Sequence, residues 1–239
     1  MIVLFLSITS LAHSGLATSS SRVIFENDEN QKSFILANIN EYPIIVQSWV
    51  DEGEGNSNYL NSPFVVTPPV FKMQQDQNQS IRIIYKGNEL PQDRESVYWL
   101  NLYEIPGKAI NQKNKFEPEQ AYLNLAMNTQ LKIFYRPKKL IKMDLDMIIS
   151  NLDFSIQNLD GKTYIICKNS SPYNISFAKL KIYTLNDTIP AEQLMDMMVK
   201  PFSNKIFIFT GNIAKKSILK LDYDIIDDHG KILSKSFIF

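Results

Sequence analysis

The sequence predicts an all-β protein made of two β-sandwich domains. Short runs rich in Val, Ile, Phe and Tyr recur along the 239 residues, and clusters of Asn, Asp, Gly, Ser and Pro separate them; this pattern is typical of antiparallel sandwiches. No stretch has a sustained helical period, and the best candidate, residues 190–199, is interpreted as a turn or irregular strand that buries its methionines. A proline followed by lysines near the middle of the chain divides the runs into two sets.

The N-terminal segment has the composition of a secretory signal peptide. An apolar run from Ile2 to Ile8 precedes small residues, and it is too short to span a bilayer. We expect residues 1–12 to be the signal peptide, with residue 17 as an alternative cleavage position. Because no Lys or Arg precedes the apolar run, the charged part of the signal is weak, and a buried first strand is the competing interpretation.

The remaining runs fall into two predicted immunoglobulin-like domains. Residues 13–137 form the first and residues 143–239 the second, with residues 138–142 as the linker. Pro137 cannot donate to a strand ladder, and the lysines that follow it favour water. The predicted strands of the first domain are "RVIF", "SFILANI", "IIVQSWV", "SIRIIY", "SVYWLNLY", "YLNLAM" and "LKIFY". Those of the second are "FSIQNL", "TYIICKN", "ISFAKLKIYTL", "KIFIFTG", "ILKLDYDII" and "ILSKSFIF".

Composition argues against several classes of function. Lys plus Arg and Asp plus Glu are equal at 25 each, so no net field recruits nucleic acid or an anionic membrane. The single cysteine, Cys167, cannot form an internal disulfide and is expected to be buried and free. The two histidines, His13 and His229, form no cluster of metal-ligand spacing; the later cleavage position would remove His13, and His229 lies in the predicted turn "DDHGK". We therefore expect a protein that is not an enzyme and that holds no metal or cofactor.

One alternating segment, "LNLAMNTQLKI", can be interpreted in two ways. Apolar side chains share one parity, and Asn, Ala, Gln and Lys occupy the other. On alternation alone, this is a half-buried strand of the protein's own core, or a strand whose apolar face is meant for a partner. The apolar positions are Leu123, Leu125, Met127, Leu131 and Ile133.

Several motifs occur in order along both sets of strands. They are "SRVIF" (21–25), "FVVTPPVFKM" (64–73), "SIRII" (80–84), "LPQDRESVYWLNLYEIP" (90–106), "LKIFYRP" (131–137), "NSSPYNISFAKLKI" (169–182) and "VKPFS" (199–203). In these motifs the chain resembles the periplasmic pilus chaperones, the PapD-like family, over nearly its whole length. Several ordered motifs over two sandwiches make the resemblance specific.

The resemblance implies a fold, a compartment and a mechanism. Family members have two immunoglobulin-like domains arranged as an L, act in the periplasm without ATP, and hold a pilus subunit that lacks its own last strand. They lend a strand to the subunit's groove and deliver the subunit to an outer-membrane usher. By alignment on "LKIFYRP", the donor residues here are Leu123, Leu125 and Met127. The expected partners are therefore pilus or fimbrial subunits and an usher, with self-association of the free chaperone left open and no nucleic-acid or membrane-embedded role.

Two sets of charged residues also follow from the resemblance. The family anchors the subunit's C-terminal carboxylate with an arginine and a lysine, which match Arg22 and Lys132. An interdomain salt bridge maps onto Glu95, Arg136 and Asp228. The expected anchor is chemically sound, because a sheltered carboxylate needs charged donors.

Two other functions remain open at this stage. A secreted two-domain adhesin or structural pilus protein is the runner-up, and a hydrolase that uses His229 and its neighbouring aspartates is the third reading. Ser21 replaces the threonine usual in the family. The long segment 106–122 and the absence of a cysteine pair leave the loop-length branch open, with the short-loop branch favoured.

Overall fold

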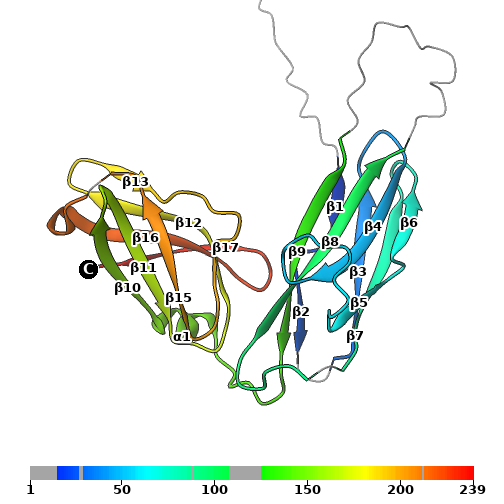
Figure 1. Cartoon of the computed structure of the whole chain (residues 1–239), viewed down its shortest axis with the longest axis horizontal. Coiled ribbons are helices and arrows are strands. Elements are labelled where there is room, and N and C mark those ends of the chain that lie inside the picture. The colour runs from blue at the N-terminus through cyan, green and yellow to red at the C-terminus, as the bar shows by residue number, and fades with distance from the viewer. Residues whose placement is uncertain (1–14, 27–28, 88, 108–124, 212) are drawn as a thin grey trace, which may run out of the picture. The chain divides into compact units, whose positions relative to one another are not determined.

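The computed structural model consists mostly of β-strands (Figure 1). Contacts divide the chain into two compact units: the first lies within residues 1–19, 31–84 and 100–130, and the second within residues 20–30, 85–99 and 131–239. Strands β8 (Ser96–Pro106) and β9 (Met127–Arg136) run through the boundary between these ranges. The structure describes residues 15–26, 29–87, 89–107, 125–211 and 213–239.

The first set of strands forms two sheets. Their orders are β1-β3-β7-β5 and β2-β9-β8-β4-β6. Pairing is antiparallel between β1 and β3, β3 and β7, and β4 and β6, whereas β2 runs parallel to β9. The bounds are β1 Leu16–Thr18, β2 Arg22–Glu26, β3 Gln31–Asn38, β4 Ile44–Asp51, β5 Phe64–Thr67, β6 Val70–Met73 and β7 Asn78–Tyr85.

Buried and exposed side chains alternate along these strands, so that one face of each sheet is apolar. In β3, Phe34 and Leu36 are buried while Ile35 between them is exposed, and in β7 Ile81 and Ile83 are buried around an exposed arginine. Successive side chains of a strand point to opposite faces, so a period of two in hydrophobicity places one row in the core. The same pattern in the sequence predicted these strands.

Strand β1 lies next to the expected signal peptide. Residues 1–12 lie outside the described residues, as does Leu123. Leu16 pairs with Asn38 and Thr18 with Leu36. Cleavage as late as residue 17 would remove two of the three residues of β1, so β1 remains whole only with the earlier cleavage position.

The second set of strands also forms two layers. One sheet has the order β10-β11-β15; the other has the order β13-β12-β16-β17, with β14 paired to β12. Aromatic rings fill the space between them: Phe177 meets Phe207 and Tyr223 edge to face, at 5.6 Å and 5.7 Å between ring centroids. The bounds are β10 Leu152–Leu159, β11 Lys162–Asn169, β12 Ile175–Thr184, β13 Thr188–Pro190, β14 Met198–Val199, β15 Ser203–Phe209, β16 Ile218–Ile226 and β17 Ile232–Phe237.

Cys167 belongs to this second core. It is fully buried and free, as the sequence predicted. Burial, together with the charge of Asp153, raises the pKa of its thiol to about 12. The thiol is therefore protonated and unreactive at neutral pH, which suits a purely structural residue.

The sequence missed one short helix. Helix α1 (Leu145–Ser150) precedes β10, and the Asp144 carboxylate accepts a hydrogen bond from the backbone N–H of Met147 at 2.8 Å, which caps its N-terminus. Six residues are too few to give a helical period. A 3-10 turn lies at Lys215–Ser217. Among the described residues, no helix is long and apolar enough to cross a bilayer.

Candidate functional site

Arg22 and Lys132 are direct neighbours across two parallel strands. The register of β2 on β9 pairs Arg22 with Lys132, so the strands bring both predicted anchor residues to the same level. The Arg22 guanidinium lies over the Phe134 ring, 5.6 Å from its centroid, and donates through Nη1 to the Ile226 carbonyl at 3.1 Å. Burial lowers the pKa of Arg22, and the carboxylates of Asp228 and Asp227 oppose this. Its Nε is buried without a hydrogen-bond partner among the described residues.

Lys132 has a carboxylate beside it. Its Nζ lies 2.8 Å from Oδ1 of Asp196, and the two side chains are 21% and 36% exposed. No sequence motif points to Asp196, which lies among methionines in a segment interpreted as a turn or irregular strand. The partner of the predicted anchor lysine is thus a finding of the tertiary structure.

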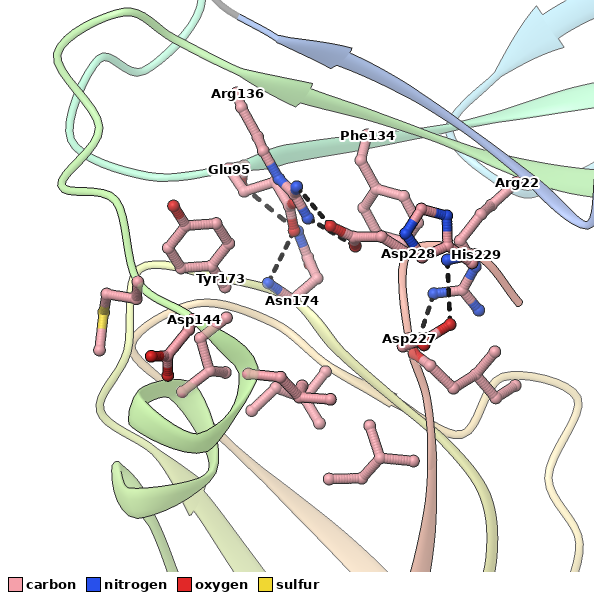
Figure 2. Close-up of a pocket in the computed structure, with 16 residues that line it drawn as sticks. Arg22, Glu95, Phe134, Arg136, Asp144, Tyr173, Asn174, Asp227, Asp228 and His229 are labelled. Atoms are coloured by element: carbon pink, nitrogen blue, oxygen red, sulfur yellow. Dashed lines mark hydrogen bonds and ion pairs between the residues drawn. The ribbon is translucent and has the colours of Figure 1, made fainter. Parts of the chain in front are cut away.

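Arg136, at the end of β9, joins the other predicted set of charges. It donates two hydrogen bonds to Asp228, at 2.6 Å from Nη1 and 2.8 Å from Nη2, and one from Nε to Oε1 of Glu95 at 2.8 Å. Figure 2 shows the guanidinium between these two carboxylates. Burial acts to lower the pKa of Arg136, but Asp228 and Glu95 outweigh it and raise the pKa. The forked geometry fits an arginine and no lysine.

Glu95 is the most deeply buried member of this group. Its side chain is 1% exposed, and its second oxygen, Oε2, accepts from the backbone N–H and from Nδ2 of Asn174, each at 2.8 Å. Burial raises the pKa of Glu95, while Arg136 and Asn174 oppose the rise. The site therefore needs Asn174 as well as the three predicted residues. Asn174 lies in the motif "NSSPYN", but the motif did not mark it as a partner of Glu95.

The turn between β16 and β17 holds Asp228 in place. Oδ1 of Asp227 accepts from the backbone N–H groups of His229 and Lys231 at 2.9 Å and 2.8 Å. Gly230 closes the turn at φ 79°, and a Cβ there would collide with the Ser21 hydroxyl. His229 thus lies in a turn, where its backbone N–H donates to Asp227.

A cavity of about 270 Å³ lies against these residues (Figure 2). Arg22, Phe134, Arg136, Tyr173 and His229 contribute to its lining. It is smaller than the roughly 300 to 1,000 Å³ typical of drug-sized ligand sites. Among the described residues, no group of three or more His, Cys, Asp or Glu side chains could hold a metal ion. Its lining also includes the acidic residues Glu95, Asp144, Asp227 and Asp228, so the charge of the two arginines is balanced within the cavity.

Two of the three predicted donor residues, Leu125 and Met127, lie just before and at the start of β9, and both are exposed. Leu125 and Met127 are 64% and 56% exposed. On the opposite parity, Asn128 Nδ2 and Gln130 Nε2 donate to Oδ1 of the buried Asn101, at 3.0 Å and 2.8 Å. These amides hold the polar face of the segment against β8, which leaves the apolar side chains facing solvent.

Two family models match the chain in tandem. The N-terminal domain of PapD, described as a pili and flagellar-assembly chaperone, matches residues 15–141, and the C-terminal domain of the pili assembly chaperone PapD matches residues 148–237. The chain belongs to the PapD family of pili assembly chaperones. This membership confirms the predicted fold class of two immunoglobulin-like sandwiches and the predicted role as a pilus chaperone. It does not favour the alternative, an adhesin or structural pilus protein.

Relatives agree with this membership over most of their lengths. The chain is 30% identical to the probable fimbrial chaperone YadV of Escherichia coli (strain K12), across 94% of this chain and 90% of that protein. It is 37% identical to the chaperone protein LpfB of Salmonella typhimurium, across 69% and 66%. The crystal structure of the YadV chaperone superposes with a TM-score of 0.76 at 28% identity, covering 94% of this chain and 99% of that one. The SafB chaperone, solved with the Salmonella enterica SafA pilin, shares the fold at a TM-score of 0.72 and 22% identity, covering 96% and 99%.

Proposed function

We propose that this PapD-family chaperone works in the periplasm, captures fimbrial subunits by lending them part of its own β9 strand, and passes them to an outer-membrane usher. The role involves no turnover and no ATP, in keeping with a family of chaperones. Family membership and the similarity to chaperones that carry fimbrial names support the proposal.

One observation carries the donor-strand part of the proposal. Leu125 and Met127 are exposed, whereas Leu131 and Ile133, on the same parity, are buried. An apolar row left open to water is a feature that a soluble protein keeps for a partner. In a subunit groove, each fully buried apolar side chain would contribute about 1.5 to 3 kcal/mol, with backbone pairing added.

The basic pair provides the other part of the mechanism. Arg22 and Lys132 are paired across the neighbouring strands β2 and β9. The Nε–H group of Arg22 is buried and has no hydrogen-bond partner among the described residues. A terminal carboxylate bound there would receive charge-assisted hydrogen bonds. It would also fix the register of the subunit strand, because a slip of one residue turns every apolar side chain away from its pocket.

Co-expression with the fimbrial subunits encoded beside this chain tests the proposal. We expect a one-to-one complex in the periplasmic fraction, recovered by pulling on a tag at the chaperone's C-terminus. Arg22→Ala and Lys132→Ala should each remove the complex while the chaperone stays folded, as judged by circular dichroism.

A matched control is Lys168→Ala, which removes an exposed lysine from β11. This variant should retain the complex. If the complex survives both Arg22→Ala and Lys132→Ala, the carboxylate anchor does not lie at this pair. If no complex forms with the unaltered chain, subunit capture itself is refuted.

A further inference from the structure

Asp196 is held in place by its own segment and faces the anchor lysine. Its Oδ1, which lies 2.8 Å from Nζ of Lys132, also accepts the backbone N–H of Met198 at 3.0 Å. That second hydrogen bond restrains the carboxylate before any partner arrives. Asp196 is therefore a positioned charge, unlike the freely rotating acid of an exposed loop.

The segment around Asp196 is itself fixed. Met197 and Met198 are 5% and 2% exposed, and Met198 pairs with Ser176 of β12. The backbone N–H of Leu194 points at the Met197 sulfur, 3.4 Å away. Burial of Met197 and Met198 restrains the backbone directly after Asp196, whereas Met195 before it is fully exposed.

A ligand carboxylate at Lys132 would meet this resident carboxylate. An ammonium group has three N–H donors, so two acceptors can be accommodated, but two negative groups on one nitrogen repel each other at close range. The repulsion is weakened less by solvent at a site where the lysine is only 21% exposed. Binding a terminal carboxylate must therefore displace Asp196 or tolerate its charge.

We propose that Asp196 occupies Lys132 in the free chaperone and competes with the terminal carboxylate of an arriving subunit. This inference rests on the proposed function of Lys132 as an anchor. Asp196 then sets the strength of the anchor: it shields a partly buried cation when no subunit is present, and it keeps the bound carboxylate exchangeable when one is.

The test compares Asp196→Asn with the native chain. Asparagine has nearly the same shape and keeps an oxygen that can accept from Met198, but it carries no charge. The probe is a synthetic peptide that copies the last strand of a fimbrial subunit encoded beside this chain, made with a free C-terminal carboxylate and also as the C-terminal amide. By calorimetry or fluorescence anisotropy, we expect Asp196→Asn to bind the free-carboxylate peptide about twofold to fivefold more tightly, because a partly exposed ion pair contributes up to about 1 kcal/mol. The affinity for the amide should not change.

Two further variants make the outcome specific. Asp160→Asn removes a charge from an exposed turn position at φ 48°, which asparagine tolerates, and should bind both peptides as the native chain does. Lys132→Met should weaken binding of the free-carboxylate peptide, and adding Asp196→Asn to it should then have no effect, because the competition acts through the lysine.

The failures of the two proposals are distinguishable. If Lys132→Met binds the carboxylate peptide as the native chain does, the anchor assignment fails. If Lys132→Met weakens binding but Asp196→Asn leaves it unchanged or weakens it, the anchor stands and the competing role of Asp196 is overturned. If the Asp196→Asn variant binds the free-carboxylate peptide more weakly than the native chain does, the Asp196 carboxylate orients Lys132 for its ligand.

Discussion

The two halves of strand β9 share one alternating pattern but have opposite surroundings. In the first half, Met127 is exposed and the polar parity is held by Asn101. In the second half, Leu131 and Ile133 are buried, and the strand ends at the ion pairs of Arg136. Alternation alone does not decide whether the apolar face of a strand is exposed. The face is free to bind a partner only where no other part of the chain covers it.

The largest effect is expected at the end of the buried half. Arg136→Ala leaves the Glu95 carboxylate, 1% exposed, without its cation, and removing one partner of a buried ion pair costs about 3 to 5 kcal/mol. We expect the free energy of unfolding, measured by urea denaturation, to fall by that amount. Arg94→Ala, which breaks an exposed pair with Asp93, should leave the unfolding curve nearly unchanged. Equal losses for both variants would contradict the importance we give to burial.

The next prediction applies the same truncation to both halves. Ile133→Ala removes a fully buried side chain and should lower the free energy of unfolding by about 2 to 5 kcal/mol. Met127→Ala, at an exposed position, should stay within about 0.5 kcal/mol of the native chain. On the proposed function, Met127→Ala should also weaken subunit binding about tenfold or more, because a groove contact of 1.5 kcal/mol or above is lost. If Met127→Ala lowers the free energy of unfolding as much as Ile133→Ala does, Met127 belongs to the protein's own core.

A smaller effect is expected where the first half is held in place. Asn101→Ala removes the buried oxygen to which Asn128 and Gln130 donate. Because these donors reach solvent, we expect a loss of about 0.5 to 1.5 kcal/mol, the net contribution of a typical hydrogen bond. Amide hydrogen exchange should speed up across Met127–Gln130 more than at the end of β9. Asn78→Ala, at an exposed position of β7, provides the control. Uniform exchange along β9 in the Asn101 variant would argue against a local clamp.

The smallest effect concerns pH. Because burial raises the pKa of Glu95, the folded chain keeps that proton to higher pH than the unfolded chain does. The contribution of Glu95 to the free energy of unfolding therefore falls as pH rises above about 4.3, the ordinary pKa of glutamate. Subtracting the pH profile of Glu95→Gln from that of the native chain should show this decline. A difference that rises with pH would mean that Arg136 and Asn174 outweigh the effect of burial.

Much of the fold could be predicted because it depends on local pattern. Period-two alternation identified the longer strands, and turn residues identified their limits. The short strands β1, β5, β6, β13 and β14 were not among the predicted ones. Helix α1 was missed because a six-residue helix shows no period. The whole of "YLNLAM" is predicted to be strand, yet Leu125 and Ala126 lie before β9, which begins at Met127, and the residues before Leu125 lie outside the described part of the chain.

The candidate site was predictable only in part. Motif resemblance named Arg22, Lys132, Glu95, Arg136 and Asp228, and the structure brings the last three together and sets the first two side by side. The role of Arg22 and Lys132 in binding a subunit is a proposal. Three polar partners had no signal strong enough to single them out, namely Asn101, Asn174 and Asp196.

The sequence by itself determined the all-β class, the order of the strands and which side chains alternate, since these depend on neighbours one or two residues apart. Tertiary structure alone decided that Lys132 meets Asp196, 64 positions along the chain, and that Glu95 meets Asn174, 79 positions along. Such contacts depend on how the strands pack, which no local period records. The same packing buries one half of β9 and leaves Leu125 and Met127 exposed.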